Sequence, residues 1–247
     1  MHPESVALMQ DIWQLLDQTN GALAALQIDL STAKVRYPSV KAESEASVHR
    51  WEWSSSLPRY ELDPLYFLDR SARRGKATNK QPQVIRNKHQ YGLDSSGRVV
   101  VERDHTELAG KFYERFYRYG DAEISAVLYD YSDSKDPINC SRLTLERGIP
   151  ASLHQRAQYG AESHIYVPRD GLIQRFCSLH MPDGREPFGG DGELVFRGDS
   201  TVEVWHRQPD GSRELSFSGA SSLYNTLASI HRGATASSGP MRLPRSP

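Results

Sequence analysis

Residues 162–217 have the sequence ESHIYVPRDGLIQRFCSLHMPDGREPFGGDGELVFRGDSTVEVWHRQPDGSRELSF, and this stretch decides which fold we expect. Apolar and polar residues alternate in several of its segments, most clearly in TVEVWHR (201–207), and Gly-containing sequences separate the segments. Alternation places successive side chains on opposite faces of a half-buried strand. Gly supplies the positive φ that tight hairpin turns require. The stretch therefore predicts consecutive antiparallel hairpins.

The same pattern extends toward the N-terminus. We expect tight turns at DSSG (94–97), RDG (169–171), PDG (182–184), GDG (190–192) and PDG (209–211). We expect strands at Trp51–Trp53 and at 98–102, 122–131, 141–146, 162–167, 172–180, 193–197, 201–207 and 213–217. Residues 105–119 are compatible with a helix or a strand, and their aromatic content together with a turn at Gly120-Asp121 favours the strand.

Both ends of the chain have helical patterns. Apolar residues recur at three- and four-residue steps over 4–18, Gly21 is a plausible break, and a second helical stretch follows over 23–30. These stretches predict either a helical hairpin or one kinked helix. Near the C-terminus, four apolar residues fit one helical face and Gly233 ends the pattern; they are Leu223, Tyr224, Leu227 and Ile230.

Together these patterns predict an α+β fold that is mainly an antiparallel β meander, with an N-terminal helical element and a C-terminal helix. We expect the helical element at 1–33, one β-rich domain at 34–232, and a disordered tail at 233–247, which has three Pro and little apolar content.

Composition excludes several classes of protein. Hydrophobic residues are 38% of the 247 residues and charged residues 25%. No apolar run approaches the roughly 18 residues that a membrane span needs. The first residues lack the basic and apolar regions of a secretory signal. Two Cys, Cys140 and Cys177, cannot form a disulfide framework, and we expect both to be buried thiols. The sequence therefore predicts a cytoplasmic protein with no membrane partner.

Residues 70–88 are the sharpest change in composition. They carry seven positive charges and no acidic residue, and the whole chain carries −1, so the remaining residues carry −8. The seven cations are Arg70, Arg73, Arg74, Lys76, Lys80, Arg86 and Lys88. Such a stretch is typical of an exposed loop that contacts an acidic ligand, either a protein by charge complementarity or a nucleic acid through its phosphates.

One segment has a resemblance to a known family. YGLDSSGRVVVE, residues Tyr91–Glu102, resembles a unit of the YD repeat in Rhs-type bacterial shell proteins, in which a Tyr and an Asp precede a Gly-Arg turn. Residues 117–131 and 158–176 share a Tyr-Gly pair, although the spacing of the three segments is irregular. The resemblance covers at most about a third of the chain and implies a series of hairpins.

No catalytic motif assigns an active site, and no nucleotide-binding fingerprint is present, so we predict no cofactor. The chain has nine His, without a HxH or HExxH pattern. His164, His180 and His206 are predicted on strands that could be neighbours, and three imidazoles that converge could bind a metal ion.

Three functions from different classes are compatible with these features. The first is a non-enzymatic bacterial protein-binding module, with an immunity protein that neutralises a toxin partner as its best-fitting example. The second is an enzyme whose site is assembled from dispersed His residues on the sheet. The third is a nucleic-acid-associated protein that uses 70–88. We favour the first, because size, separated charge and a wide strand-built surface suit recognition by shape and charge.

Overall fold

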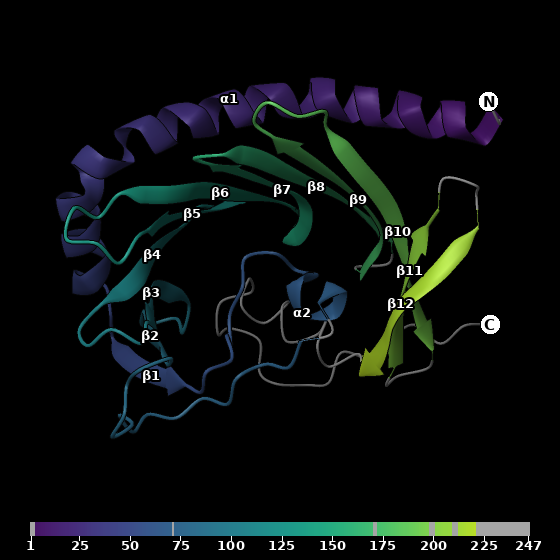
Figure 1. Cartoon of the computed structure of the whole chain (residues 1–247). Coiled ribbons are helices and arrows are strands. Elements are labelled where there is room, and N and C mark those ends of the chain that lie inside the picture. The colour runs from purple at the N-terminus through teal and green to yellow at the C-terminus, as the bar shows by residue number, and fades with distance from the viewer. Residues whose placement is uncertain (1–2, 71, 170–171, 198–200, 209–211, 221–247) are drawn as a thin grey trace.

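The computed structural model describes residues 3–220, except 71, 170–171, 198–200 and 209–211. A long helix lies over one twelve-stranded sheet, and a short helix lies under it (Figure 1). The elements are α1 (Pro3–Ala46), β1 (Arg50–Ser54), α2 (Tyr66–Asp69), β2 (His89–Leu93), β3 (Val99–His105), β4 (Phe112–Tyr119), β5 (Glu123–Tyr129), β6 (Pro137–Glu146), β7 (Ile149–Ala157), β8 (Gly160–Arg169), β9 (Leu172–Pro182), β10 (Phe188–Arg197), β11 (Thr201–Arg207) and β12 (Arg213–Ala220).

The sheet is an uninterrupted antiparallel meander. Each strand pairs with the next one along the chain, from β1 to β12. Figure 1 shows the sheet curved into an arch, with α1 along its convex side and α2 beneath it on the concave side. The predicted meander and N-terminal helical element are confirmed. The predicted C-terminal helix and tail lie outside the described residues.

The strand prediction for the ambiguous segment 105–119 is confirmed, since β3 ends at His105 and β4 begins at Phe112. The turns at 94–97 and 182–184 are also confirmed, with positive φ at Gly97 and Gly184. The turn at 190–192 is wrong, because these residues lie within β10. A Cβ at Gly192 would stand 2.5 Å from the Phe176 ring, so this Gly provides space for a neighbouring side chain rather than a turn.

Strand β7 is not predicted by alternation, because both of its faces are covered. Leu153 belongs to the core on the concave side. His154 is buried on the other face, where its Nδ1 hydrogen-bonds Ser163 Oγ at 2.9 Å and α1 contacts the strand. A strand buried on both faces loses the alternation of polar and apolar residues.

Helix α1 continues without a break from Pro3 to Ala46, so the predicted break at Gly21 is wrong and the predicted boundary at residue 33 falls inside the helix. Pro38 is also within the helix. A proline in a helix removes one backbone hydrogen bond and bends the helix. Figure 1 shows the C-terminal part of α1 turned down along the curve of the sheet. Packing of α1 on the sheet outweighs the weak helix propensity of Gly21 and Pro38.

Replacing Gly21 with alanine (Gly21→Ala) should raise the free energy of unfolding by about 0.5–1 kcal/mol, because Ala loses less backbone entropy than Gly in a helix. A Cβ at this position meets no atom within 4 Å. Urea denaturation of the two proteins measures the difference. A loss of stability would show that Gly21 has the positive φ of a helix end, and would contradict a continuous α1.

Two apolar cores lie on the two faces of the sheet. The larger, on the concave side, joins residues of α2 and its flanking segment to inward-facing residues of most strands, from Tyr91 to Val204. The smaller lies between α1 and the convex face and includes Leu26, Phe116 and Tyr129. Among the described residues, no helix is both long enough and apolar enough to cross a membrane.

A buried carboxylate holds α1 to the sheet. Glu114 on β4 is 0% exposed. Its Oε1 accepts a hydrogen bond from Arg103 Nε at 2.9 Å, and its Oε2 accepts one from the Tyr37 hydroxyl of α1 at 2.7 Å. Lys41 Nζ, also on α1, lies 3.6 Å from Oε2. Each partner therefore contributes to compensating a charge that water does not reach.

Candidate functional site

The basic stretch 70–88 follows α2 and forms an irregular segment before β2. Its first part is packed rather than free. The Arg70 guanidinium lies 4.5 Å from the centre of the Tyr66 ring, and that of Arg74 lies 4.1 Å from the centre of the Phe67 ring. Arg74 also donates a hydrogen bond to the Arg59 carbonyl at 3.0 Å. Burial, together with nearby Arg59, lowers the pKa of Arg74 to about 10, so it remains a cation at neutral pH.

The segment is fixed to the scaffold at two further points. Thr78 and Trp53 exchange two backbone hydrogen bonds, of 2.8 and 2.9 Å, at the edge of β1. Gly75 donates to the Pro58 carbonyl at 2.9 Å and is buried. A Cβ at Gly75 would lie 1.9 Å from Ser54 Oγ, so only glycine allows this close approach.

Four cations of the stretch face solvent. Arg73, Lys76, Lys80 and Arg86 are exposed, and none of them forms an ion pair with another residue in the described parts of the chain. Lys88 is half-buried just before β2. We name the four exposed residues, Arg73, Lys76, Lys80 and Arg86, the basic loop surface. Arg73 and Lys76 lie beside the anchoring contacts of Arg74, Gly75 and Thr78, so an external acidic group can bind them at little cost in ordering the backbone.

The three predicted metal ligands lie on the concave face, and two of them meet. His164 Nε2 lies 2.7 Å and His180 Nδ1 3.4 Å from the same oxygen, Oε1 of Glu162, and the two rings are 6.2 Å apart. His206 instead packs edge-on against Phe176 at 5.5 Å. Within the described residues, no three His, Cys, Asp or Glu side chains are grouped so that they could hold a metal ion. The geometry gives the three-histidine site no support.

A second charged group on the concave face centres on Arg115. Its Nη1 lies 3.2 Å from Glu61 Oε2, from Glu102 Oε2 and from the Tyr117 hydroxyl oxygen. The Tyr117 hydroxyl donates to the same Glu102 oxygen at 2.7 Å. Glu102 and Arg115 are paired in the register of β3 and β4, while Glu61 comes from the segment before α2. One guanidinium thus stands between two carboxyl groups in a partly buried space.

The carboxyl group of Glu61 is expected to titrate near neutrality. Burial, with Glu102 and Asp63 nearby, raises its pKa from 4.5 to about 7, although Arg115 acts in the opposite direction. The folded chain therefore binds this proton more tightly than the unfolded chain. The resulting contribution to stability is complete below about pH 4 and is lost as the pH rises through 7.

Replacing this residue with glutamine (Glu61→Gln) should remove that pH dependence. Relative to the wild type, the variant should gain about 3 kcal/mol of unfolding free energy between about pH 4 and about pH 8. Urea denaturation of both proteins across this range measures the gain. A difference that does not change with pH would contradict a protonated Glu61 in the folded state.

No family model, curated protein or solved structure matches this chain. Any proposal about function therefore rests on the arrangement of this chain's own residues.

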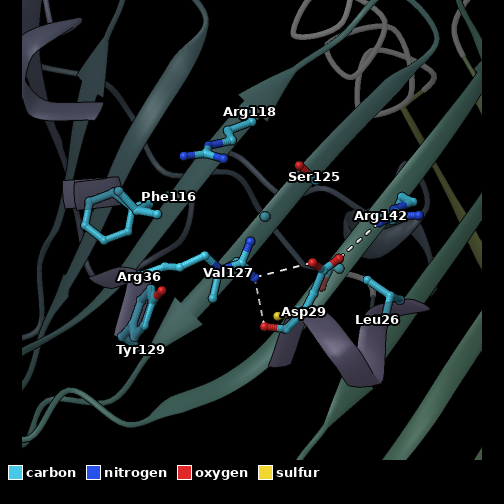
Figure 2. Close-up of a pocket in the computed structure, with 13 residues that line it drawn as sticks. Leu26, Asp29, Arg36, Phe116, Arg118, Ser125, Val127, Tyr129 and Arg142 are labelled. Carbon is cyan, nitrogen blue, oxygen red and sulfur yellow. Dashed lines mark hydrogen bonds and ion pairs between the residues drawn. The ribbon is translucent and has the colours of Figure 1, made fainter. Parts of the chain in front are cut away.

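A further pocket, of about 210 Å³, lies under α1 on the convex face. Figure 2 shows Asp29 of α1 between Arg36 and Arg142. Arg142 Nη2 of β6 donates to Asp29 Oδ2 at 3.1 Å, and Arg36 Nη2 donates to Asp29 Oδ1 at 3.3 Å. The Arg142–Asp29 contact attaches the helix to the sheet, and the Arg36–Asp29 contact within α1 holds the carboxylate in place, so we assign this pocket a structural role.

The two predicted thiols lie on separate strands, and neither is part of a disulfide. Cys140 is buried in that pocket, and burial raises its pKa to about 12. It is therefore a thiol at neutral pH, as expected for a core residue. Cys177 on β9 is only half-buried.

Proposed function

We propose that this protein is a non-enzymatic binding module for an acidic protein partner, and that the basic loop surface is its contact element. The best-fitting role is that of a bacterial, cytoplasmic immunity protein that covers acidic groups at the active site of a toxin partner. The observation that supports this proposal is the set of four exposed loop cations without an ion pair in the described structure.

The anchoring of the loop supports binding by shape as well as by charge. The contacts of Arg74, Gly75 and Thr78 fix the backbone on both sides of Lys76. A preorganised segment loses less entropy when a partner binds, so more of the interaction energy appears as affinity. Two exposed apolar side chains, Leu57 and Val84, lie in or near this segment and can add apolar contact.

A protein partner fits these features better than a nucleic acid. The residues outside 70–88 carry −8, so a long polyphosphate that extends past the loop would meet net negative charge. Proteins that bind single strands stack bases on exposed aromatic rings, whereas residues 71–88 contain no aromatic side chain. The rings of Tyr66 and Phe67, just before the stretch, already have Arg70 and Arg74 over them. The partner is therefore expected to present a limited acidic patch.

Co-expression with the product of the adjacent gene tests the proposal. We expect the two proteins to co-purify through size-exclusion chromatography and the partner's toxicity to be suppressed. A parallel gel-shift assay with random-sequence RNA and DNA at low salt should show no shift. A shift would favour the nucleic-acid function. A neighbourhood of biosynthetic genes whose products do not bind would contradict the immunity role.

A further inference from the structure

A cavity of about 430 Å³ lies on the concave side, between the segment that carries α2 and strands β2 to β5. Its polar lining comprises Glu61, His89, Glu102, Asp104 and Arg115. The volume is in the range of small-molecule sites, which are usually concave and hold a few convergent polar groups. This cavity is separate from the basic loop surface, so its role goes beyond the proposed protein binding.

His89 lines this cavity and has a buried polar atom without a hydrogen bond to any described residue. The residue is 8% exposed, and its buried Nδ1 has no hydrogen-bond partner among the described residues. Nδ1 lies 3.7 Å from Asp104 Oδ1 and 3.9 Å from Glu102 Oε1. Both distances are too long for hydrogen bonds. A buried polar atom without a partner costs free energy, so the gap between these atoms is a place where a donor group would be stabilised.

The neighbouring contacts hold these three atoms in position. The His89 ring stacks on Tyr91 with centroids 6.1 Å apart and an interplanar angle of 9°. The other oxygen of Glu102, Oε2, accepts hydrogen bonds from Arg115 and Tyr117. No described residue donates a hydrogen bond to Glu102 Oε1 or to Asp104 Oδ1. In the tautomer that carries its proton on Nε2, His89 Nδ1 is an acceptor, and three acceptor atoms then converge without a donor between them.

The charges of the lining favour a cation. Three carboxyl groups, those of Glu61, Glu102 and Asp104, face a single permanent cation, Arg115. A primary ammonium group carries three N–H donors and one positive charge. It matches three acceptors in number and compensates the excess of carboxylates, and charge-assisted hydrogen bonds of this kind are the strong ones. A neutral ligand would leave the excess charge uncompensated.

We propose that this cavity binds a primary alkylammonium group, with its nitrogen between His89 Nδ1, Glu102 Oε1 and Asp104 Oδ1. The remaining walls suit an aliphatic chain, because Pro58, Leu128 and the rings of Tyr66 and Tyr113 line them. Aromatic rings also attract cations through their π faces. The group belongs either to a free small amine or to the lysine side chain of a peptide.

Isothermal titration calorimetry on the full chain tests this proposal, with n-pentylamine, cadaverine and N-acetyl-lysine amide as probes. We expect at least one probe to bind, and the comparison of the first two with the third identifies the source of the amine. 1-Pentanol has a similar chain without the charge and is expected not to bind. The proposal would be overturned if 1-pentanol bound as tightly as the amines or if none of the three amines bound. It would also be overturned if the protein bound Zn²⁺ or Mg²⁺ but none of the amines.

A pair of matched variants locates the site. Asp104→Asn removes one acceptor charge from a half-exposed side chain and should weaken amine binding at least about tenfold. Asp183→Asn removes an exposed carboxylate outside the cavity and should leave the affinity unchanged. In the wild-type protein, NMR should show the amine shifting the His89 imidazole signals. Unchanged affinity in Asp104→Asn, or unshifted His89 signals, would place the amine elsewhere and overturn the assignment.

Discussion

Replacing Arg103 with methionine (Arg103→Met) is expected to lower the free energy of unfolding by about 3 kcal/mol. Arg103 donates its Nε hydrogen bond to Glu114, whose carboxylate is 0% exposed beneath α1. Without the guanidinium, this carboxylate keeps, among the residues that the structure describes, the Tyr37 hydroxyl and Lys41 at 3.6 Å. Breaking a buried ion pair by removing one partner commonly costs 3–5 kcal/mol, and we expect the lower end of this range because Lys41 remains. Urea denaturation measures the loss.

Arg118→Met is the matched control, because Arg118 also joins the sheet to α1 through a carboxylate. Its Nη2 lies 2.8 Å from Glu43 Oε2, but both side chains are more than half exposed. Exposed pairs contribute about 0–1 kcal/mol, so this variant should remain close to the wild type. Combining Arg103→Met with Glu114→Gln should restore part of the lost stability. Equal losses in the two single variants would contradict the description of Glu114 as a buried anchor.

The second large effect concerns affinity for the proposed partner. The variant Lys76→Gln/Lys80→Gln/Arg86→Gln removes three exposed charges from the basic loop surface and should raise the Kd by about 10- to 100-fold. The variant Arg118→Gln/Arg147→Gln/Arg185→Gln changes the net charge equally at exposed sites elsewhere. It should bind almost as well as the wild type. Calorimetry with the purified partner measures both. Similar losses would show that net charge, rather than this loop, determines binding.

Much of the fold could be predicted from the sequence, because alternation in half-buried strands is a local signal. The segment 201–207 alternates and forms β11. Strand β7 lacks that signal because α1 covers its outer face at His154. The sequence predicts a break at Gly21 that α1 does not have, because local propensity does not include the stabilisation that a long helix gains from packing on a sheet. Tertiary contacts therefore explain these two errors.

The two candidate sites differ in how far sequence could find them. The basic stretch 70–88 follows from composition alone, since it has seven cations and no acidic residue. Which four of these cations form the basic loop surface depends on the packing of Arg70 and Arg74. The cavity does not, because it depends on the register that places Glu102 opposite Arg115 and on an irregular segment that brings Glu61 to them. Arg115 and Tyr117 lie two residues apart and share one face of a strand, which points to a polar group on that face. This signal can be used only once residues 112–119 are known to be a strand.

The measurement that tests the central claim most directly is the association rate constant of the partner as a function of salt. For the wild-type protein, we expect this rate constant to fall steeply between low and physiological salt, because exposed charges steer the encounter and salt screens them. For the variant Lys76→Gln/Lys80→Gln/Arg86→Gln, we expect a slow rate with little dependence on salt. The same steep dependence in both proteins would contradict a binding role for the basic loop surface.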